Sequence, residues 1–296
     1  MPVPSESTPV TSEDLSPELG ALLASLTELP PSNDPAAVVT AALAARAAAP
    51  LQPPPTDGEV AAFSRAVDDV QHTLRLLSND DWALPAVNGL SVGELVGHLI
   101  GTQLEMMVGL GPDGAGIAGG DHIEATREAI VAGAAMGPVA AADEFARASA
   151  LLLDHVNSLD ARELEETATF GPITAEIRVL LLLRVFELWT HDNDLRSAVG
   201  LHRVEPDPDR LWMMTRAAMP LVSAMGGDRL HVVLTGTGGG VWPATGSEVG
   251  EIVVDAVDFC RRVANRMPLD ELHAELSGDV AAAERVLHDL VALALD

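Results

Sequence analysis

The sequence predicts an α+β protein in which a helical region is followed by a small mixed domain. From Gly58 to about Gly200, apolar residues recur at spacings of three and four, which is typical of amphipathic helices. After Pro206 and Pro208 the pattern changes to short alternating segments between helical ones. We therefore expect two folded domains, residues 56–205 and residues 206–296.

The first 55 residues differ from the rest in composition. They hold 11 of the 20 prolines, and six acidic side chains against a single basic one, Arg46. Such a composition is typical of a linker or tail. We expect residues 1–55 to form a Pro-rich, acidic and partly disordered extension that contributes no catalytic residue.

Individual signals place the helices of the first domain. Val60, Phe63 and Val67 begin an apolar stripe, and Ser91 with Glu94 has the form of a capping box at the start of a second helix. Gly200 is a natural residue to follow the end of the last helix, whose apolar middle we place at the bundle centre. The predicted helices span about 59–77, 91–110, 122–135, 139–159 and 174–200.

The second domain is predicted to mix helices and strands. A glycine-rich connection, residues 236–240, separates two apolar segments and indicates a hairpin. The predicted helices span about 208–225, 255–266 and 279–295, and the predicted strands 230–235, 241–242, 251–254 and 273–276.

Charge and composition exclude several classes of function. The formal net charge is −27, which disfavours binding to nucleic acids and to anionic membranes. The longest strongly apolar run, residues 179–183, is far below the roughly 20 residues that span a bilayer. The N-terminal residues lack the pattern of a secretory signal, so we expect a cytoplasmic protein. All 17 basic side chains are Arg and there is no Tyr, which excludes Schiff-base chemistry and a Tyr acid or base.

A candidate metal site lies in the last helix of the first domain. Glu187 and His191 are four residues apart, so both side chains lie on one face of a helix. His98, on the second helix, is suited to be a third ligand. Two imidazoles and a carboxylate suit zinc and leave a coordination position open. The pair is a weak signal by itself, because Glu187 can instead pair with Arg184 and His191 can be an ordinary core histidine.

Four segments resemble the mycothiol-dependent maleylpyruvate isomerase family. They are DDWALPAVNGLSVGELVGHLIG, RVFELWTHDNDLRSAVG, VVDAVDFCRRVANR and ELSGDVAAAERVL. The resemblance covers roughly residues 58–296 and implies a DinB-like four-helix bundle followed by a small α+β domain. It also implies that the family's metal ligands correspond to His98, Glu187 and His191.

The resemblance implies an activity as well. The founding activity of the family is the conversion of maleylpyruvate to fumarylpyruvate with the thiol mycothiol, so the resemblance implies a metal- and mycothiol-dependent isomerase or S-transferase. Its partners would be a small thiol and a small carboxylate or electrophile. The alternative is a non-enzymatic metal- or ligand-binding regulator that retains the bundle. We expect a monomer or a homodimer.

Three further residues bear on catalysis. By resemblance, Arg266 is the candidate for binding a carboxylate, with Arg261 and Arg262 as rivals and a surface ion pair as the alternative. Cys260 is interpreted as a buried hydrophobic residue rather than a nucleophile. Asp194 can orient His191, although a carboxylate on the helix surface is the simpler interpretation.

Overall fold

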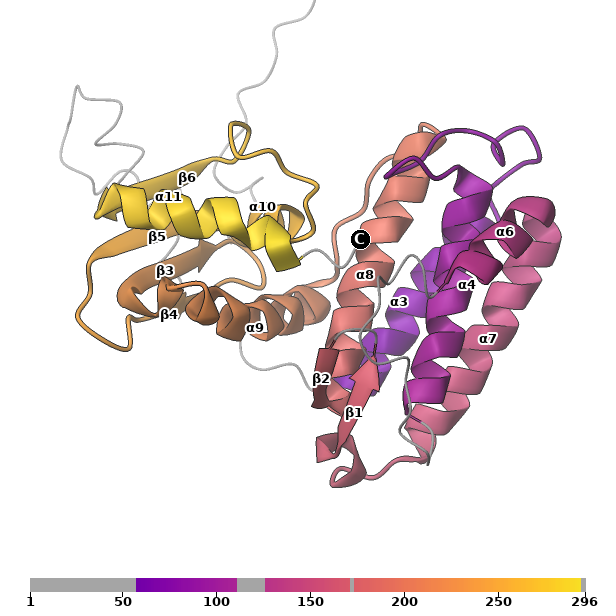
Figure 1. Cartoon of the computed structure of the whole chain (residues 1–296), viewed down its shortest axis with the longest axis horizontal. Coiled ribbons are helices and arrows are strands. Elements are labelled where there is room, and N and C mark those ends of the chain that lie inside the picture. The colour runs from indigo at the N-terminus through magenta and orange to yellow at the C-terminus, as the bar shows by residue number, and fades with distance from the viewer. Residues whose placement is uncertain (1–56, 111–125, 171–172, 294–296) are drawn as a thin grey trace, which may run out of the picture. The chain divides into compact units, whose positions relative to one another are not determined.

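The computed structural model describes residues 57–110, 126–170 and 173–293 of the chain. The predicted extension, residues 1–55, and the first residues of the helix predicted at 122–135 lie outside these ranges. The described residues belong to one compact unit that spans Leu51–Asp296. They form an α+β fold, as the sequence predicts (Figure 1).

Four long helices make up the bundle. They are α3 (Glu59–Leu74), α4 (Val92–Gly109), α7 (Pro138–Ser158) and α8 (Ile177–Ala198). Helices α3 and α4 each contact both α7 and α8, so the four helices enclose a common core. The short helix α6 (Arg127–Ala135) packs on α4. The predicted stripe of the first helix is confirmed, because Phe63 and Val67 are completely buried.

The predicted capping box at the start of α4 is confirmed. The backbone N–H of Glu94 donates to the Ser91 hydroxyl, and the backbone N–H of Ser91 donates to the Glu94 carboxylate at 2.7 Å. These bonds satisfy two donors that a helix N-terminus otherwise leaves open. The start of α4 is thereby fixed at Val92, six residues before His98.

The beginning of the last bundle helix was predicted too early. Helix α8 begins at Ile177, and Thr174 lies in strand β2 (Ile173–Glu176). This strand pairs antiparallel with β1 (Thr167–Phe170). The hairpin was missed, although its alternating Thr and apolar residues favour extended backbone. The end of the helix is confirmed, since Gly200 has a φ of 74°.

The mixed part after residue 205 contains a four-stranded sheet in the order β4-β3-β5-β6. Strand β3 (Leu230–Thr235) pairs antiparallel with β4 (Gly240–Trp242) and parallel with β5 (Gly250–Asp255), which pairs antiparallel with β6 (Ala274–Gly278). The helices are α9 (Pro208–Ala224), α10 (Ala256–Val263) and α11 (Val280–Asp289). Short 3₁₀ turns lie at Glu163–Glu165, Gly227–Arg229 and Leu290–Leu293.

Arg266 lies outside the helix to which it was assigned. The predicted helix at residues 255–266 ends at Val263, because Asn265 adopts a left-handed conformation with a φ of 56°. Arg266 therefore sits in the segment after α10. The two halves of the compact unit are in contact through α8 and α9, and the exact domain boundary at 205/206 stays a prediction.

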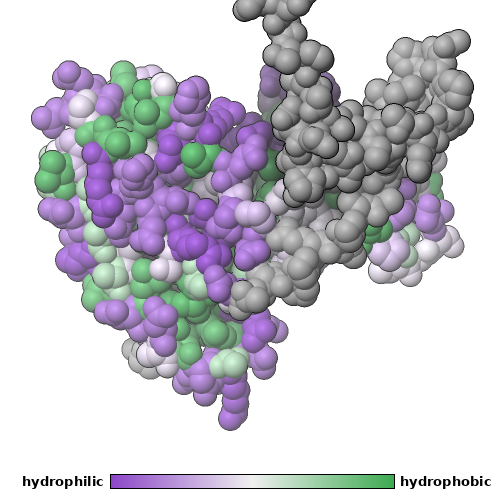
Figure 2. Space-filling view, turned by 180° about the vertical axis from the view of Figure 1, so that it is seen from behind, coloured by the Kyte–Doolittle hydropathy of each residue, from purple (hydrophilic) through white to green (hydrophobic). Residues whose placement is uncertain are grey.

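The exposed surface is largely polar. Hydrophilic side chains cover most of the bundle face seen in Figure 2, between small hydrophobic patches. Val131 and Val139 are among the most exposed large hydrophobic residues of the described ranges. No helix in these ranges has both the length and the apolarity required to cross a membrane.

Candidate metal centre

The three predicted ligands come together in the interior of the bundle. His98 projects from α4, and Glu187 and His191 project from one face of α8. One ligand atom from each residue lies within 4.8 Å of the others. The side chains of His98, Glu187 and His191 are 1%, 8% and 3% exposed, so the cluster is shielded from solvent.

The spacing of these atoms fits a metal ion. His98 Nε2 and Glu187 Oε1 are 3.4 Å apart. Ligand atoms about 2.1 Å from a tetrahedral zinc ion lie about 3.4 Å from one another. Within the described ranges the cluster has three members, all of the types that zinc prefers. The arrangement can hold an ion through one atom of each of the three residues.

His98 contacts Thr126, the residue that precedes α6. The two atoms His98 Nδ1 and Thr126 Oγ1 are 2.8 Å apart in a buried position. The ring of His98 meets the ring of His191 edge to face, with centroids 5.4 Å apart. The contact with Thr126 occupies Nδ1 and leaves Nε2 directed toward Glu187.

Glu187 is oriented by Arg184 from the preceding turn of α8. Arg184 Nη1 lies 2.5 Å from Glu187 Oε2, and the Arg184 side chain is completely buried. Arg184 Nη2 also donates to Gln103 at 3.4 Å, and the Gln103 amide donates to Ser149. The alternative pairing of Glu187 with Arg184 thus exists, but it uses one carboxylate oxygen and leaves the other facing His98.

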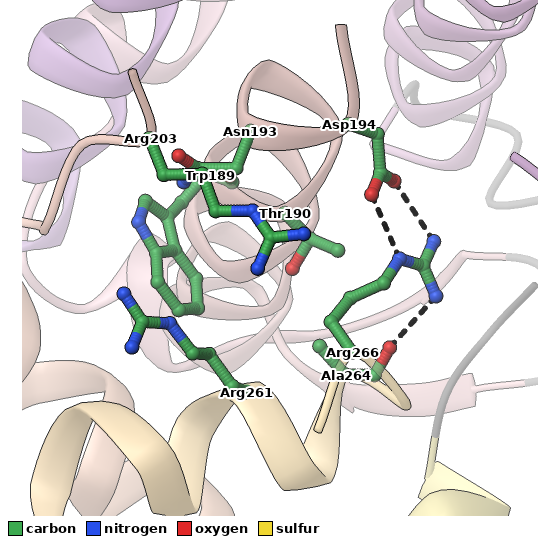
Figure 3. A pocket seen from close by; sticks show the side chains of 8 residues that line it. All are labelled: Trp189, Thr190, Asn193, Asp194, Arg203, Arg261, Ala264 and Arg266. Carbon is green, nitrogen blue, oxygen red and sulfur yellow. Dashed lines mark hydrogen bonds and ion pairs between the residues drawn. The ribbon is translucent and has the colours of Figure 1, made fainter. Parts of the chain in front are cut away.

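His191 is oriented by Asp194, which also contacts Arg266. His191 Nδ1 lies 3.0 Å from Asp194 Oδ2, and the Arg266 Nε and Nη2 groups donate to the two Asp194 oxygens at 2.9 Å (Figure 3). Burial raises the pKa of the Asp194 carboxyl, but its bonds with His191 and Arg266 lower it more, so the pKa lies below its ordinary value. The interpretation of Asp194 as a surface carboxylate is wrong.

A narrow pocket lies beside this ion pair. Trp189 and Thr190 line it from α8, and Arg203, Arg261 and Arg266 reach it from other segments (Figure 3). The indole N–H of Trp189 donates to the carbonyl of Val204. Because its lining residues come from α8, the segment after α8, α10 and the segment after α10, the pocket lies where these parts of the chain meet.

The other candidates from the second domain have structural contacts. Arg261 pairs with Asp258, and Arg262 donates to three backbone carbonyls, those of Met267, Leu287 and His288. Arg266 is the member of this group that contacts the residue orienting a predicted ligand. Cys260 is completely buried in α10, as expected of a hydrophobic residue.

Sequence reasoning missed Thr126 and the cooperation of Arg184 with the site. Thr126 is 28 residues from His98 and follows a segment outside the described ranges, so no helical spacing indicates their contact. Arg184 was considered only as a competitor for Glu187. Its position three residues earlier on the same helix is the signal that was available.

Comparisons with known proteins agree with this geometry. Residues 63–196 match the sequence profile of the mycothiol maleylpyruvate isomerase N-terminal domain. The fold matches a crystal structure of a mycothiol-dependent maleylpyruvate isomerase with a TM-score of 0.54 and 17% identity, covering 73% of this chain and 91% of that one. A histidine-to-alanine mutant of a mycothiol-dependent maleylpyruvate isomerase matches with the same values. A search of curated proteins gave no significant match.

The profile match begins inside α3 and ends inside α8, so it includes all three predicted ligands. The structural match extends over most of the described chain and shows a shared fold. The resemblance inferred from the sequence is therefore confirmed over residues 63–196, which match the model of the mycothiol maleylpyruvate isomerase N-terminal domain.

Proposed function

We propose that the chain binds one divalent metal ion, zinc by preference, through His98, Glu187 and His191. The observation that carries this proposal is the convergence of three buried ligand atoms within 4.8 Å. Each ligand also has a separate partner that orients it, as is usual around protein-bound metals. The ligating atoms are then His98 Nε2, Glu187 Oε1 and His191 Nε2.

On this site we propose a thiol-dependent isomerase or S-transferase. A bound divalent ion lowers the pKa of a coordinated thiol and so supplies thiolate at neutral pH. The chain's single thiol, Cys260, is buried in α10, and the sequence has neither Lys nor Tyr to act as a nucleophile. A small thiol from solution meets this need, and the relatives described as mycothiol-dependent make mycothiol the first candidate.

The proposed substrates are small electrophiles that bear a carboxylate, with maleylpyruvate as the first candidate. In the isomerase reaction a bound thiolate would supply a nucleophile that adds to one carbon of an activated cis double bond. The remaining single bond could then rotate, and loss of the thiolate would restore the double bond as the trans isomer. In the transferase reaction the sulfur would stay on one substrate carbon and the neighbouring carbon would take up a proton, so that the thiol adds across the double bond.

The proposed role of Arg266 is to bind the substrate carboxylate. Its guanidinium lies beside the pocket lined by Trp189 and Asp194, and a guanidinium matches a carboxylate in shape and charge. Its ion pair with Asp194 keeps it next to the ligand His191. Substrate bound at Arg266 would thus lie near the metal-binding cluster.

Metal analysis of the full chain tests the first part of this proposal. Protein stripped with chelator and dialysed against zinc should retain one equivalent, and His191→Ala should lose it. His72→Ala is the matched control, since His72 is an exposed histidine of the same bundle. Full zinc retention by His191→Ala would contradict the assigned ligands.

Activity is tested separately. The zinc-loaded protein should consume maleylpyruvate, or couple an electrophile to mycothiol, only when both metal and thiol are present. Full activity without thiol would exclude the mechanism. Zinc binding without either activity would favour the alternative, a regulatory protein that retains the bundle.

A further inference from the structure

Helix α6 lies very close to α4 because glycines face each other between the two helices (Figure 1). A Cβ atom added at Gly97 of α4 would lie 2.4 Å from the backbone oxygen of Ala129. A Cβ atom added at Gly133 of α6 would lie 2.4 Å from the Cα atom of Gly97. No residue with a side chain fits at these positions without a shift of the backbone.

The close approach brings Thr126 to the metal-binding cluster. Thr126 immediately precedes α6 and packs on Gly101 of α4, where an added Cβ would lie 2.9 Å from the Thr126 Cβ atom. The Thr126 side chain is almost completely buried, and its Oγ1 atom lies 2.8 Å from His98 Nδ1. The glycines of α4 thus allow Thr126, which precedes α6, to contact His98 at Nδ1, the ring nitrogen that is not the proposed ligating atom.

We propose that Thr126 is the positioning residue of His98, whose Nδ1–H it holds so that the Nε2 lone pair faces Glu187 and His191. A neutral imidazole carries its proton on one nitrogen and can ligate a metal only through the other. The threonine hydroxyl is an acceptor at the distance of a normal hydrogen bond from Nδ1. This inference rests on the metal site of the proposed function.

The two histidines are therefore positioned by chemically different partners. His191 has the ionised carboxylate of Asp194, which is in turn paired with Arg266. His98 has a neutral hydroxyl, supplied by the residue that precedes α6. Substitution at Thr126 should consequently act on metal affinity without changing the charge of the site.

Zinc affinity of the full chain, measured by competition with a chromophoric chelator, tests the proposal. Thr126→Val keeps the shape but removes the hydroxyl, and it should weaken zinc binding by about 10- to 100-fold. Thr126→Ser restores a hydroxyl and should bind zinc nearly as the wild type does. The matched control is Thr102→Val, because the buried Thr102 hydroxyl donates to the Leu99 carbonyl and not to a ligand. Wild-type affinity in Thr126→Val would overturn the inference.

Nitrogen NMR of histidine-labelled protein provides a readout that a purely structural role would not change. The His98 signals, assigned by their loss in His98→Ala, should show the proton on Nδ1 in the wild type, and its solvent exchange should be faster in Thr126→Val. A proton on Nε2 in the wild type would overturn the inference. Failure of the wild type to bind zinc would instead contradict the proposed function, and the NMR of the metal-free chain would still decide the role of Thr126.

Discussion

Arg266 and Asp194 form a two-point ion pair that connects the segment after α10 to the last helix of the bundle. The Arg266 Nε and Nη2 groups each donate to a different oxygen of Asp194 at 2.9 Å. Asp194 in turn contacts His191 Nδ1 at 3.0 Å. A residue 72 positions later in the sequence is thus two contacts away from a proposed metal ligand.

Separate substitutions at this pair should have different effects. Asp194→Ala should lower zinc affinity by about 10- to 100-fold, because His191 loses the partner that orients it. Arg266→Ala should retain its zinc, since Arg266 is not one of the proposed ligands and its guanidinium donates to Asp194 and the Ala264 carbonyl, but it should lose thiol-dependent turnover. Chelator competition and a turnover assay measure the two effects. Asp258→Ala, which breaks the nearby pair with Arg261, is the control. Normal kinetics in Arg266→Ala would remove that residue from the site.

Arg184→Met should destabilise the metal-free protein more than the zinc-bound protein. Arg184 is completely buried, and its loss leaves the Glu187 charge without compensation, at a cost of about 3–5 kcal/mol. Bound zinc would compensate that charge and reduce the loss. Urea unfolding with and without zinc measures the difference. Arg178→Met, which breaks a more exposed pair with Glu165, should change stability by at most about 1 kcal/mol. An equal loss in both metal states of Arg184→Met would show that zinc does not bind next to Glu187.

Gly97→Ala should weaken both the bundle and its metal binding. The added Cβ would lie 2.4 Å from the Ala129 carbonyl oxygen, so α6 must move away from α4, at a cost of about 1–3 kcal/mol. Thr126 would move with α6 and lose its contact with His98. Thermal unfolding and zinc competition measure the two effects. Gly246→Ala is the control, because its Cβ would have no neighbour within 4 Å. If the unfolding temperature fell but the zinc affinity stayed unchanged, the position of α6 would have no influence on zinc binding.

Asp207→Asn should lower stability at neutral pH but not at strongly acidic pH. Burial raises the pKa of Asp207, but its bonds and charge interactions with Arg210 and Arg65 lower it more, so the folded pKa lies below the ordinary value. When the pKa of a carboxyl is lower in the folded than in the unfolded protein, its ionised form stabilises the fold. This contribution is fully present at a pH above the unfolded pKa of about 3.9, and it is lost as the pH falls through the folded pKa. The pair is partly exposed, so the difference at pH 7 should be about 0.5–1 kcal/mol. Urea unfolding of both proteins between pH 7 and pH 3 measures it, and a difference that grows toward low pH would contradict the assignment.

Cys260 should not react with thiol reagents in the folded protein. Burial raises the pKa of its thiol far above the ordinary value, and the charge of Asp255 raises it further. The thiolate that reacts with iodoacetamide is therefore scarce, and the side chain is inaccessible. Mass spectrometry should find no alkylation under native conditions and one adduct after unfolding. Rapid reaction of Cys260 with iodoacetamide in the folded protein would make Cys260 a candidate nucleophile in place of an added thiol.

Much of the local structure was predictable because local signals encode it. The stripe that includes Phe63, the capping box of Ser91 and Glu94, and the glycine at position 200 each act within a few residues. Periodicity and capping depend on helix geometry alone, so they appear in the sequence. The hairpin of β1 and β2 was missed because its strands are short and directly adjoin a long apolar helix.

The sequence by itself determined the order of the bundle helices and of the strands after residue 205, the placement of Glu187 and His191 on one helical face, and the lack of Lys and Tyr. Two longer-range contacts around the predicted ligands were decided only by the tertiary structure. Thr126 reaches His98 because glycines let two helices approach, and Arg266 reaches Asp194 across 72 positions of the chain. Such contacts depend on how closely two helices approach each other and on where a long side chain such as that of Arg266 extends. Neither property leaves a periodic pattern in the sequence.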